Sequence, residues 1–170
     1  MTDPLRQLRD PALLRVDGFI NGIWTPGAAA ECPEVPVVQS SGLLTRAVRA
    51  IPLKDRRLSL TEDLFADEAV CILDARSRRV CIRAPGRAEI GVEADGFAHW
   101  AFWKPREAPF VCIESWTGNG DYDGYDGELA DRPSTLRLAS GSTAHHRLKY
   151  ASAGDVLLSV GRLPVAFRSY

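Results

Sequence analysis

One acidic residue, Glu114, ends the apolar run "PFVCIE" at residues 109–114. An unpaired carboxylate is costly to bury, and such a group takes up a proton rather than stay ionised in an apolar setting. Two interpretations follow. Glu114 either points to water at the end of a strand, or lies in a cleft where it can accept and release a proton.

Aromatic side chains lie close to this glutamate in the sequence. Trp116 follows it by two residues, and Trp103 closes the aromatic segment "AHWAFW" at residues 98–103. Binding pockets pair aromatic rings with a few polar groups. Arg78 lies in the basic segment "ARSRR", where a hairpin is expected.

A proton donor to partner Glu114 is harder to find. His145 and His146 stand together before an alternating segment, where a solvated or hydrogen-bonded histidine is the expected outcome. His99 lies within the aromatic segment and is the best candidate for a proton donor, although a structural role is the simpler interpretation.

Metal chemistry is not expected. The four cysteines are not arranged as CxxC pairs and have no nearby histidine, so we expect no metal site and reduced thiols in the core. The cysteines are Cys32, Cys71, Cys81 and Cys112. The Gly-rich segment "GNGDYDGYDGE" at 118–128 offers oxygen ligands for calcium, but it lacks the terminal glutamate spacing of an EF-hand.

Composition excludes several classes of partner. The 170 residues are 45% hydrophobic and 25% charged, as in an ordinary globular domain. The net charge is −1, from 21 basic and 22 acidic residues, so no basic surplus attracts nucleic acid. No apolar run approaches the roughly 20 residues that span a bilayer, and the first residues do not resemble a signal peptide. We therefore expect a cytoplasmic protein without a membrane segment.

The pattern beyond residue 44 predicts an all-β protein, an antiparallel β-sandwich. Short strands are expected at 68–74, 78–84, 87–96, 98–103, 109–114, 135–140 and 145–151, the first two joined as a hairpin by the turn at 75–77. Residues 1–40 are expected to form an N-terminal arm and linker, with a hairpin signal at Asn21-Gly22, 44–150 the sandwich, and 151–170 an extension of one or two strands.

The segment "APFVCIESWTG" at 108–118 resembles the "APF-x-CIEPW-x-G" strand of the aldose 1-epimerase (galactose mutarotase-like) family. Blocks on either side agree in order, among them "LFADEAVCILDARSRRV", "WKP" and "GELADRPSTLRLASG", so that the resemblance covers about residues 48–150. It implies a supersandwich fold with a sugar cleft on one sheet, a small-molecule aldose as substrate, and no cofactor.

The resemblance also implies roles for single residues. Glu114 matches the general base that removes the proton of the anomeric hydroxyl, while a histidine protonates the ring oxygen. Trp103 and Trp116 would then be sugar-stacking walls, with Arg78 at the border. Ser115 stands where the family has proline, which loosens the turn after the glutamate.

The family's acid histidine lies in a "GGHPAF"-like stretch, and no such stretch is present. The sandwich is therefore expected to be incomplete. Its open edges predict self-association.

Residues 5–30 resemble a different family. The segment "LRDPALLRVDGFINGIW" is similar to the N-terminal arm of succinate-semialdehyde-type aldehyde dehydrogenases, where the arm is structural. An arm of one family joined to the sandwich of another suggests a truncated or rearranged chain. Isomerase activity is in question without the histidine segment. The alternatives are a non-catalytic carbohydrate-binding module and a fragment without function.

Overall fold

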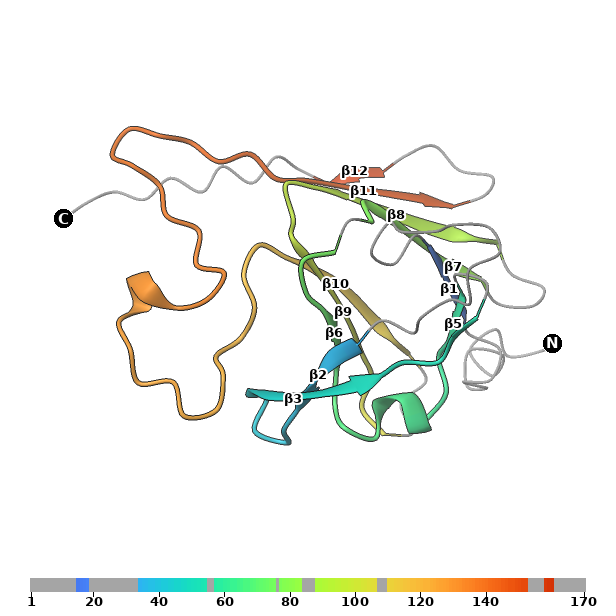
Figure 1. Ribbon diagram of the computed structural model, residues 1–170. Helices are drawn as coiled ribbons and strands as arrows, with labels where there is room; N and C mark the ends of the chain where they lie inside the picture. The colour runs from blue at the N-terminus through green and yellow to red at the C-terminus, as the bar shows by residue number, and fades with distance from the viewer. Residues whose placement is uncertain are drawn as a thin grey trace.

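The computed structural model describes residues 15–18, 34–54, 57–75, 77–83, 88–106, 110–152 and 158–160. The described residues are almost all strand and loop, with two 3-10 turns, so the predicted all-β fold is confirmed (Figure 1). The strands are β1 Arg15–Gly18, β2 Glu34–Val38, β3 Leu44–Ala50, β4 Leu53–Lys54, β5 Arg57–Ser59, β6 Val70–Ile72, β7 Arg79–Arg83, β8 Ile90–Asp95, β9 His99–Trp103, β10 Cys112–Trp116, β11 Arg147–Ser152 and β12 Leu158–Val160. The 3-10 turns are η3 Asp63–Phe65 and η4 Leu129–Asp131. No helix in the described parts is long and apolar enough to cross a membrane.

The strands form three antiparallel sheets. The largest has seven strands in the order β12-β11-β8-β7-β1-β5-β4, the second is β10-β9-β6, and the third is β2-β3. The seven-stranded sheet and the three-stranded sheet lie as separate layers in Figure 1. Between them lies the main hydrophobic core, with side chains from both sheets. This is the sandwich that the alternating pattern predicted.

Strand β9 supplies the largest side chains of this core. Trp100 and Phe102 are alternate residues of β9 and are 3% and 0% exposed. They meet Leu58, Val80 and Val92 of the opposite sheet in the same cluster. The indole Nε1–H of Trp100 donates a hydrogen bond to the Ser77 carbonyl at 2.8 Å, so its only polar group is satisfied inside the core.

The other face of the three-stranded sheet is covered in part by the β2-β3 sheet. Val38 and Leu44 form a second buried cluster with Cys71 and Ala101, and Tyr122 packs against it. Tyr122 is held there because the Leu44 N–H donates to the Asp121 carbonyl at 2.9 Å. The Asp123 N–H in turn donates to the Leu44 carbonyl at 2.8 Å, so both backbone groups of Leu44 are bonded to the residues that flank Tyr122.

The predicted hairpin over 68–84 is wrong. Strand β6 pairs with β9, whereas β7 pairs with β1 and β8 in the other sheet. Strand β6 is buried on both faces, with Val70 and Ile72 in the main core and Cys71 in the second cluster. The segment between the strands, where Asp74 has a φ of 49°, therefore carries the chain from one layer to the other.

Three other predictions about elements need correction. Residues 135–140 are loop, with Leu136 54% exposed, because alternation alone makes no strand without a neighbour to pair with. Strand β10 begins at Cys112, and Phe110 before it is 49% exposed rather than buried. Residues 34–38, expected to be linker, form β2, whose Pro36 is tolerated beside a register shift.

The N-terminal segment contributes to the large sheet. Strand β1 lies between β5 and β7, although residues 1–40 were expected to form an arm and linker. The Asn21-Gly22 hairpin signal and Cys32 lie outside the described residues. The predicted extension over 151–170 begins within β11 and includes β12, which pairs with it. Self-association through open edges such as that of β10 stays a prediction.

Substituting Phe102 tests the sandwich core. Phe102→Ala should lower the free energy of unfolding by about 3–5 kcal/mol, because the emptied space lies between two packed sheets. Phe110→Ala is the matched control and should cost less than about 1 kcal/mol at its half-exposed position. Urea unfolding followed by circular dichroism measures both. Equal losses, or a wild-type chain that melts without cooperativity, would contradict the sandwich and favour a fragment without function.

Candidate functional site

Strand register places Glu114 at one end of a row across the three-stranded sheet, on its edge strand β10. Glu114 in β10 is opposite Ala101 in β9, and Ala101 is opposite Cys71 in β6. Directly opposite residues project to the same face of a sheet. Because Cys71 and Ala101 belong to the second buried cluster, Glu114 lies on the face opposite the main core. We call this the Glu114 face; it carries alternate residues of β9 and β10.

Trp116 holds the Glu114 carboxylate in place. Residues two apart on a strand share a face, and the Trp116 indole Nε1–H donates to Glu114 Oε2 at 2.8 Å. Both residues are half-buried. The hydrogen bond satisfies one acceptor of the carboxylate and leaves its other oxygen for another donor. The Glu114 carboxylate is thus held by a neighbouring indole, and it lines neither of the two hollows described below.

The charge of Glu114 acts on two thiols. Burial, followed by the Glu114 carboxylate, raises the pKa of Cys71 to about 11, against a smaller opposing effect of Arg49. The same two causes raise the pKa of Cys112. Both thiols therefore stay protonated at neutral pH and are poor nucleophiles. None of Cys71, Cys81 and Cys112 forms a disulfide with another described residue, and only Cys71 is buried, so the prediction of core thiols holds for Cys71 alone among them.

His99 shares the Glu114 face but is buried. It is directly opposite Trp116 and only 2% exposed. Its Nδ1 accepts a hydrogen bond from the Asp74 backbone N–H at 2.9 Å, so in the neutral ring the proton is on Nε2. Burial lowers the pKa of His99, against an opposing effect of the Asp74 carboxylate. Nε2 has no hydrogen-bond partner among the described residues.

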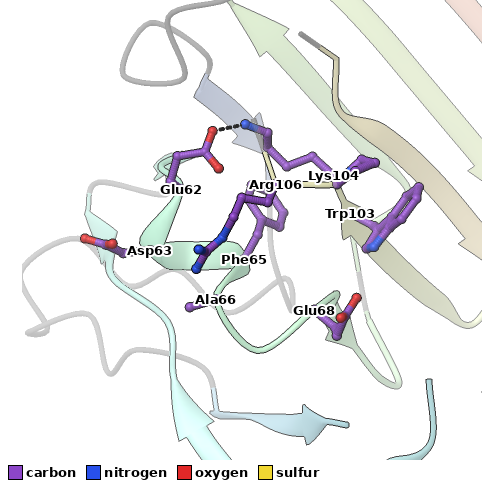
Figure 2. Close-up of a pocket in the computed structure, with 9 residues that line it drawn as sticks. Glu62, Asp63, Phe65, Ala66, Glu68, Trp103, Lys104 and Arg106 are labelled. Atoms are coloured by element: carbon purple, nitrogen blue, oxygen red, sulfur yellow. Dashed lines mark hydrogen bonds and ion pairs between the residues drawn. The ribbon is translucent and has the colours of Figure 1, made fainter. Parts of the chain in front are cut away.

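Trp103 extends the same face toward the end of the sheet. It is opposite Cys112, one alternate position beyond Ala101. It also lines a hollow of about 560 Å³ between the end of β9 and η3 (Figure 2). The neighbouring Lys104 is 5% exposed and its ammonium pairs with the Glu62 carboxylate, which fixes η3 against the end of β9. Trp103 was predicted from the sequence, but neither this hollow nor the Glu62–Lys104 pair was, since that pair joins segments far apart in the chain.

Arg78 lies elsewhere. Its guanidinium donates to the Phe97 carbonyl at 2.7 Å. It lines a second hollow of about 280 Å³ with residues of β7, β8 and β11, and neither Glu114 nor the two tryptophans line that hollow. The structure therefore brings Glu114, Trp116 and Trp103 onto one face and does not bring Arg78 to the hollow beside Trp103.

The remaining polar candidates have structural contacts. His146 Nδ1 is 2.9 Å from the Gly96 carbonyl, and its ring lies 5.2 Å from the Phe97 ring. In the Gly-rich loop, the buried Asn119 accepts a hydrogen bond from the Arg132 guanidinium at its carbonyl, 2.9 Å away. The described residues contain no group of three or more His, Cys, Asp or Glu side chains that could hold a metal ion.

Comparison with known proteins supports the fold. No family model matches the chain, and no curated protein sequence matches it. A solved structure, a galactose mutarotase-like protein from Lactobacillus casei ATCC 334, matches with a TM-score of 0.63 at 17% identity. The match covers 82% of this chain and 45% of that one, so the chain spans less than half the length of this structural neighbour. The predicted mutarotase-like fold is thereby confirmed, and nothing in the comparisons supports a dehydrogenase arm.

Replacing Glu114 should change the acidity of Cys112. Glu114→Gln removes a negative charge that raises the thiol pKa, so the pKa of Cys112 should fall and its alkylation by iodoacetamide should begin at lower pH. Peptide mass spectrometry across a pH series measures the rate at this half-buried residue. Glu128→Gln, in the exposed loop, is the matched control and should leave the profile unchanged. An unchanged profile in Glu114→Gln would place the carboxylate away from the Cys112 thiol.

Burial of His99 should make stability depend on pH. Burial lowers the pKa of His99 in the folded chain, so the unfolded chain binds the proton more tightly. The contribution of His99 to stability is therefore complete above the unfolded pKa of about 6.5. This contribution should decline as the pH falls below that value, and it is lost below the folded pKa. His99→Asn keeps an acceptor for the Asp74 N–H without the titration. Urea unfolding at about pH 7.5 and about pH 5.5 should show a smaller decline in the variant, and equal declines would place His99 in water.

Proposed function

We propose that the chain binds an aldose on the Glu114 face and that Glu114 is the general base of anomer interconversion. The observation that carries this proposal is the hydrogen bond of 2.8 Å that fixes the carboxylate beside an indole on a mutarotase-like sheet. A half-buried carboxylate on a rigid strand can accept a proton at a fixed position. The Trp116 ring supplies an apolar surface for the sugar beside it.

The reaction needs a base and an acid. Glu114 takes the proton of the anomeric hydroxyl. The electron pair of that O–H bond forms the carbonyl, and the bond between the anomeric carbon and the ring oxygen breaks. The ring oxygen takes a proton from the acid. Rotation of the aldehyde and reclosure, with both proton transfers reversed, give the other anomer. Only protons move between protein and sugar, so the reaction requires no redox cofactor. Each group supplies about 10²- to 10⁴-fold in rate.

The acid is the weak part of the site. His99 is on the correct face, with the proton on Nε2, but it is buried and its pKa is lowered. A neutral imidazole that is 2% exposed cannot reach a bound sugar without movement of the residues above it. We therefore expect slow anomer interconversion, in which water or the bound sugar itself delivers the second proton.

The burial of His99 also supports a second candidate, a carbohydrate-binding module without catalysis. Such a module would use Trp116 and Trp103 as stacking surfaces and Glu114 as a hydrogen-bond acceptor for sugar hydroxyls. Arg78 contributes less to this proposal, because it lines a different hollow. The two candidates share a ligand class and differ in the need for a charged carboxylate.

Glu114→Gln separates the two candidates. In the enzyme, mutarotation of glucose and galactose followed by polarimetry should fall to the buffer rate, because the amide cannot accept the hydroxyl proton. Sugar binding, measured by saturation-transfer NMR, should persist in the variant. Glu128→Gln should retain the wild-type rate. Binding without acceleration in the wild-type chain would support the module, and the absence of both would contradict the proposed function.

A further inference from the structure

The second hollow, of about 280 Å³, is on the outer face of the seven-stranded sheet. Arg79, Glu93 and Lys149, which line it, form one row across β7, β8 and β11. The adjacent residues of β7 and β8, Val80 and Val92, project into the main core, so the side chains of this row project away from it. The volume is slightly below the roughly 300 Å³ at which ligand pockets begin. The hollow therefore suits a few side chains of a protein partner better than a whole small ligand.

Positive charge is in excess around this hollow, which we call the basic hollow. Lys149 pairs with Glu93 at 3.2 Å, and Arg79 is 3.9 Å from the Glu89 carboxylate. The Arg147 guanidinium forms no ion pair or hydrogen bond with any described residue. Because an arginine fork binds a carboxylate through two parallel hydrogen bonds, Arg147 is suited to an acidic partner. The charged residues that line the hollow are four cations and two carboxylates: Arg78, Arg79, Arg147, Lys149, Glu93 and Asp95.

The chain itself carries a complementary acidic segment. Residues 120–131, which we call the acidic loop, contain five acidic residues and no basic residue. Two of the acids pair with arginines just beyond the loop, Asp121 at 3.2 Å and Asp131 at 2.6 Å. Asp126 is exposed, and its carboxylate forms no ion pair with a described residue. No hydrogen bond or ion pair among the described residues joins the acidic loop to the charged side chains of the basic hollow, so both surfaces are available to a partner.

The acidic loop is held in place and lies beside exposed apolar side chains. Backbone hydrogen bonds to Leu44 of β3 fix the start of the loop. Leu129, near its end, is 69% exposed, and Leu136 is 54% exposed. The Thr135 hydroxyl donates to the Leu129 carbonyl at 3.1 Å, so the two leucines lie on adjacent segments. Exposed apolar side chains beside charged ones are typical of protein interfaces, and an ordered loop loses little conformational entropy on docking.

The acidic loop and the basic hollow lie on the same side of the molecule. The hollow is at the end of the sheet where β8 ends at Asp95 and β11 begins at Arg147. Figure 1 shows the chain around η4 standing away from the sheets and leading into that end of β11. Two complementary surfaces on one side allow both contacts to form around a single two-fold axis, which closes the assembly at two copies.

We propose that the chain forms a two-fold dimer in which the acidic loop of each copy docks on the basic hollow of the other. Asp126 of one copy meets Arg147 of the other, and this pair forms twice. The contact covers Leu129 and Leu136, which removes exposed apolar surface from water. The basic hollow belongs to the opposite layer of the sandwich from the Glu114 face, so the inference does not depend on the proposed function. It also does not use the open edge of β10.

Sedimentation velocity tests the dimer. In about 0.05 M salt, the wild-type chain should shift from monomer to dimer as its concentration rises. Raising the salt to about 1 M should weaken the dimer by about tenfold or more, since the screening length falls to about 3 Å and the contact depends on opposite charges. A wild-type chain that stays monomeric at all concentrations would overturn the proposal.

Charge reversal tests the contact itself. Arg147→Glu and Asp126→Arg should each be monomeric, because like charges would then meet in both contacts. An equimolar mixture of the two variants should form a dimer again, since one of its contacts is the native pair and the other is the exchanged pair. Arg106→Glu makes the same change of charge at an exposed residue outside the basic hollow, and this matched control should keep the wild-type dimer.

The variants distinguish this dimer from other modes of self-association. A dimer that persists in both reversal variants would overturn the proposal and favour pairing through a sheet edge. Reversal variants that stay monomeric when mixed would overturn the contact between loop and hollow. Circular dichroism of the variants should match the wild type, because both positions are exposed. If a reversal variant does not fold, Arg147→Gln and Asp126→Asn remove the charges without reversing them, and an unchanged dimer in both would overturn the proposal.

Discussion

The two-sided packing of β9 is the constraint on which the other features depend. Trp100 and Phe102 project into the main core, and His99, Ala101 and Trp103 project to the opposite face. A one-residue slip would exchange these sets and expose two large aromatic side chains. Burying such side chains gives roughly 1.5–3 kcal/mol each, so the core fixes the register of β9. The positions of Glu114 and Trp116 follow, because β10 is paired to β9.

The same constraint explains why the candidate site has two parts of different character. Near Glu114, the β2-β3 sheet and Tyr122 cover Cys71 and Ala101, and this partial cover keeps the carboxylate half-buried. At the end of β9 the sheet stops, and the space is enclosed by η3 instead. There the buried Lys104 needs an opposite charge, since lysine is almost never fully buried unpaired. Glu62 supplies that charge and thereby sets the position of η3.

Local patterns predicted the strands of the sandwich better than their neighbours. The runs that became β6, β7, β8, β9 and β11 were recognisable because alternation and β-branched residues mark a half-buried strand. Pairing was not recognisable in the same way, so β6 and β7 were joined as a hairpin although they lie in different layers. The linker over 34–38 was mistaken because prolines hide a strand whose partner, β3, supplies its hydrogen bonds.

The site shows the same division between local and distant information. Glu114 and Trp116 are two residues apart, so their shared face and hydrogen bond depend only on β10 being a strand. The Glu62–Lys104 pair joins residues 42 positions apart, and the contact of Asp74 with His99 joins residues 25 apart. Such contacts depend on the complete topology. The proposed base and the indole that holds it therefore depend on one strand. A proton donor for the proposed reaction must instead be brought to the Glu114 face by another segment, as His99 is brought by the pairing of β9 with β10.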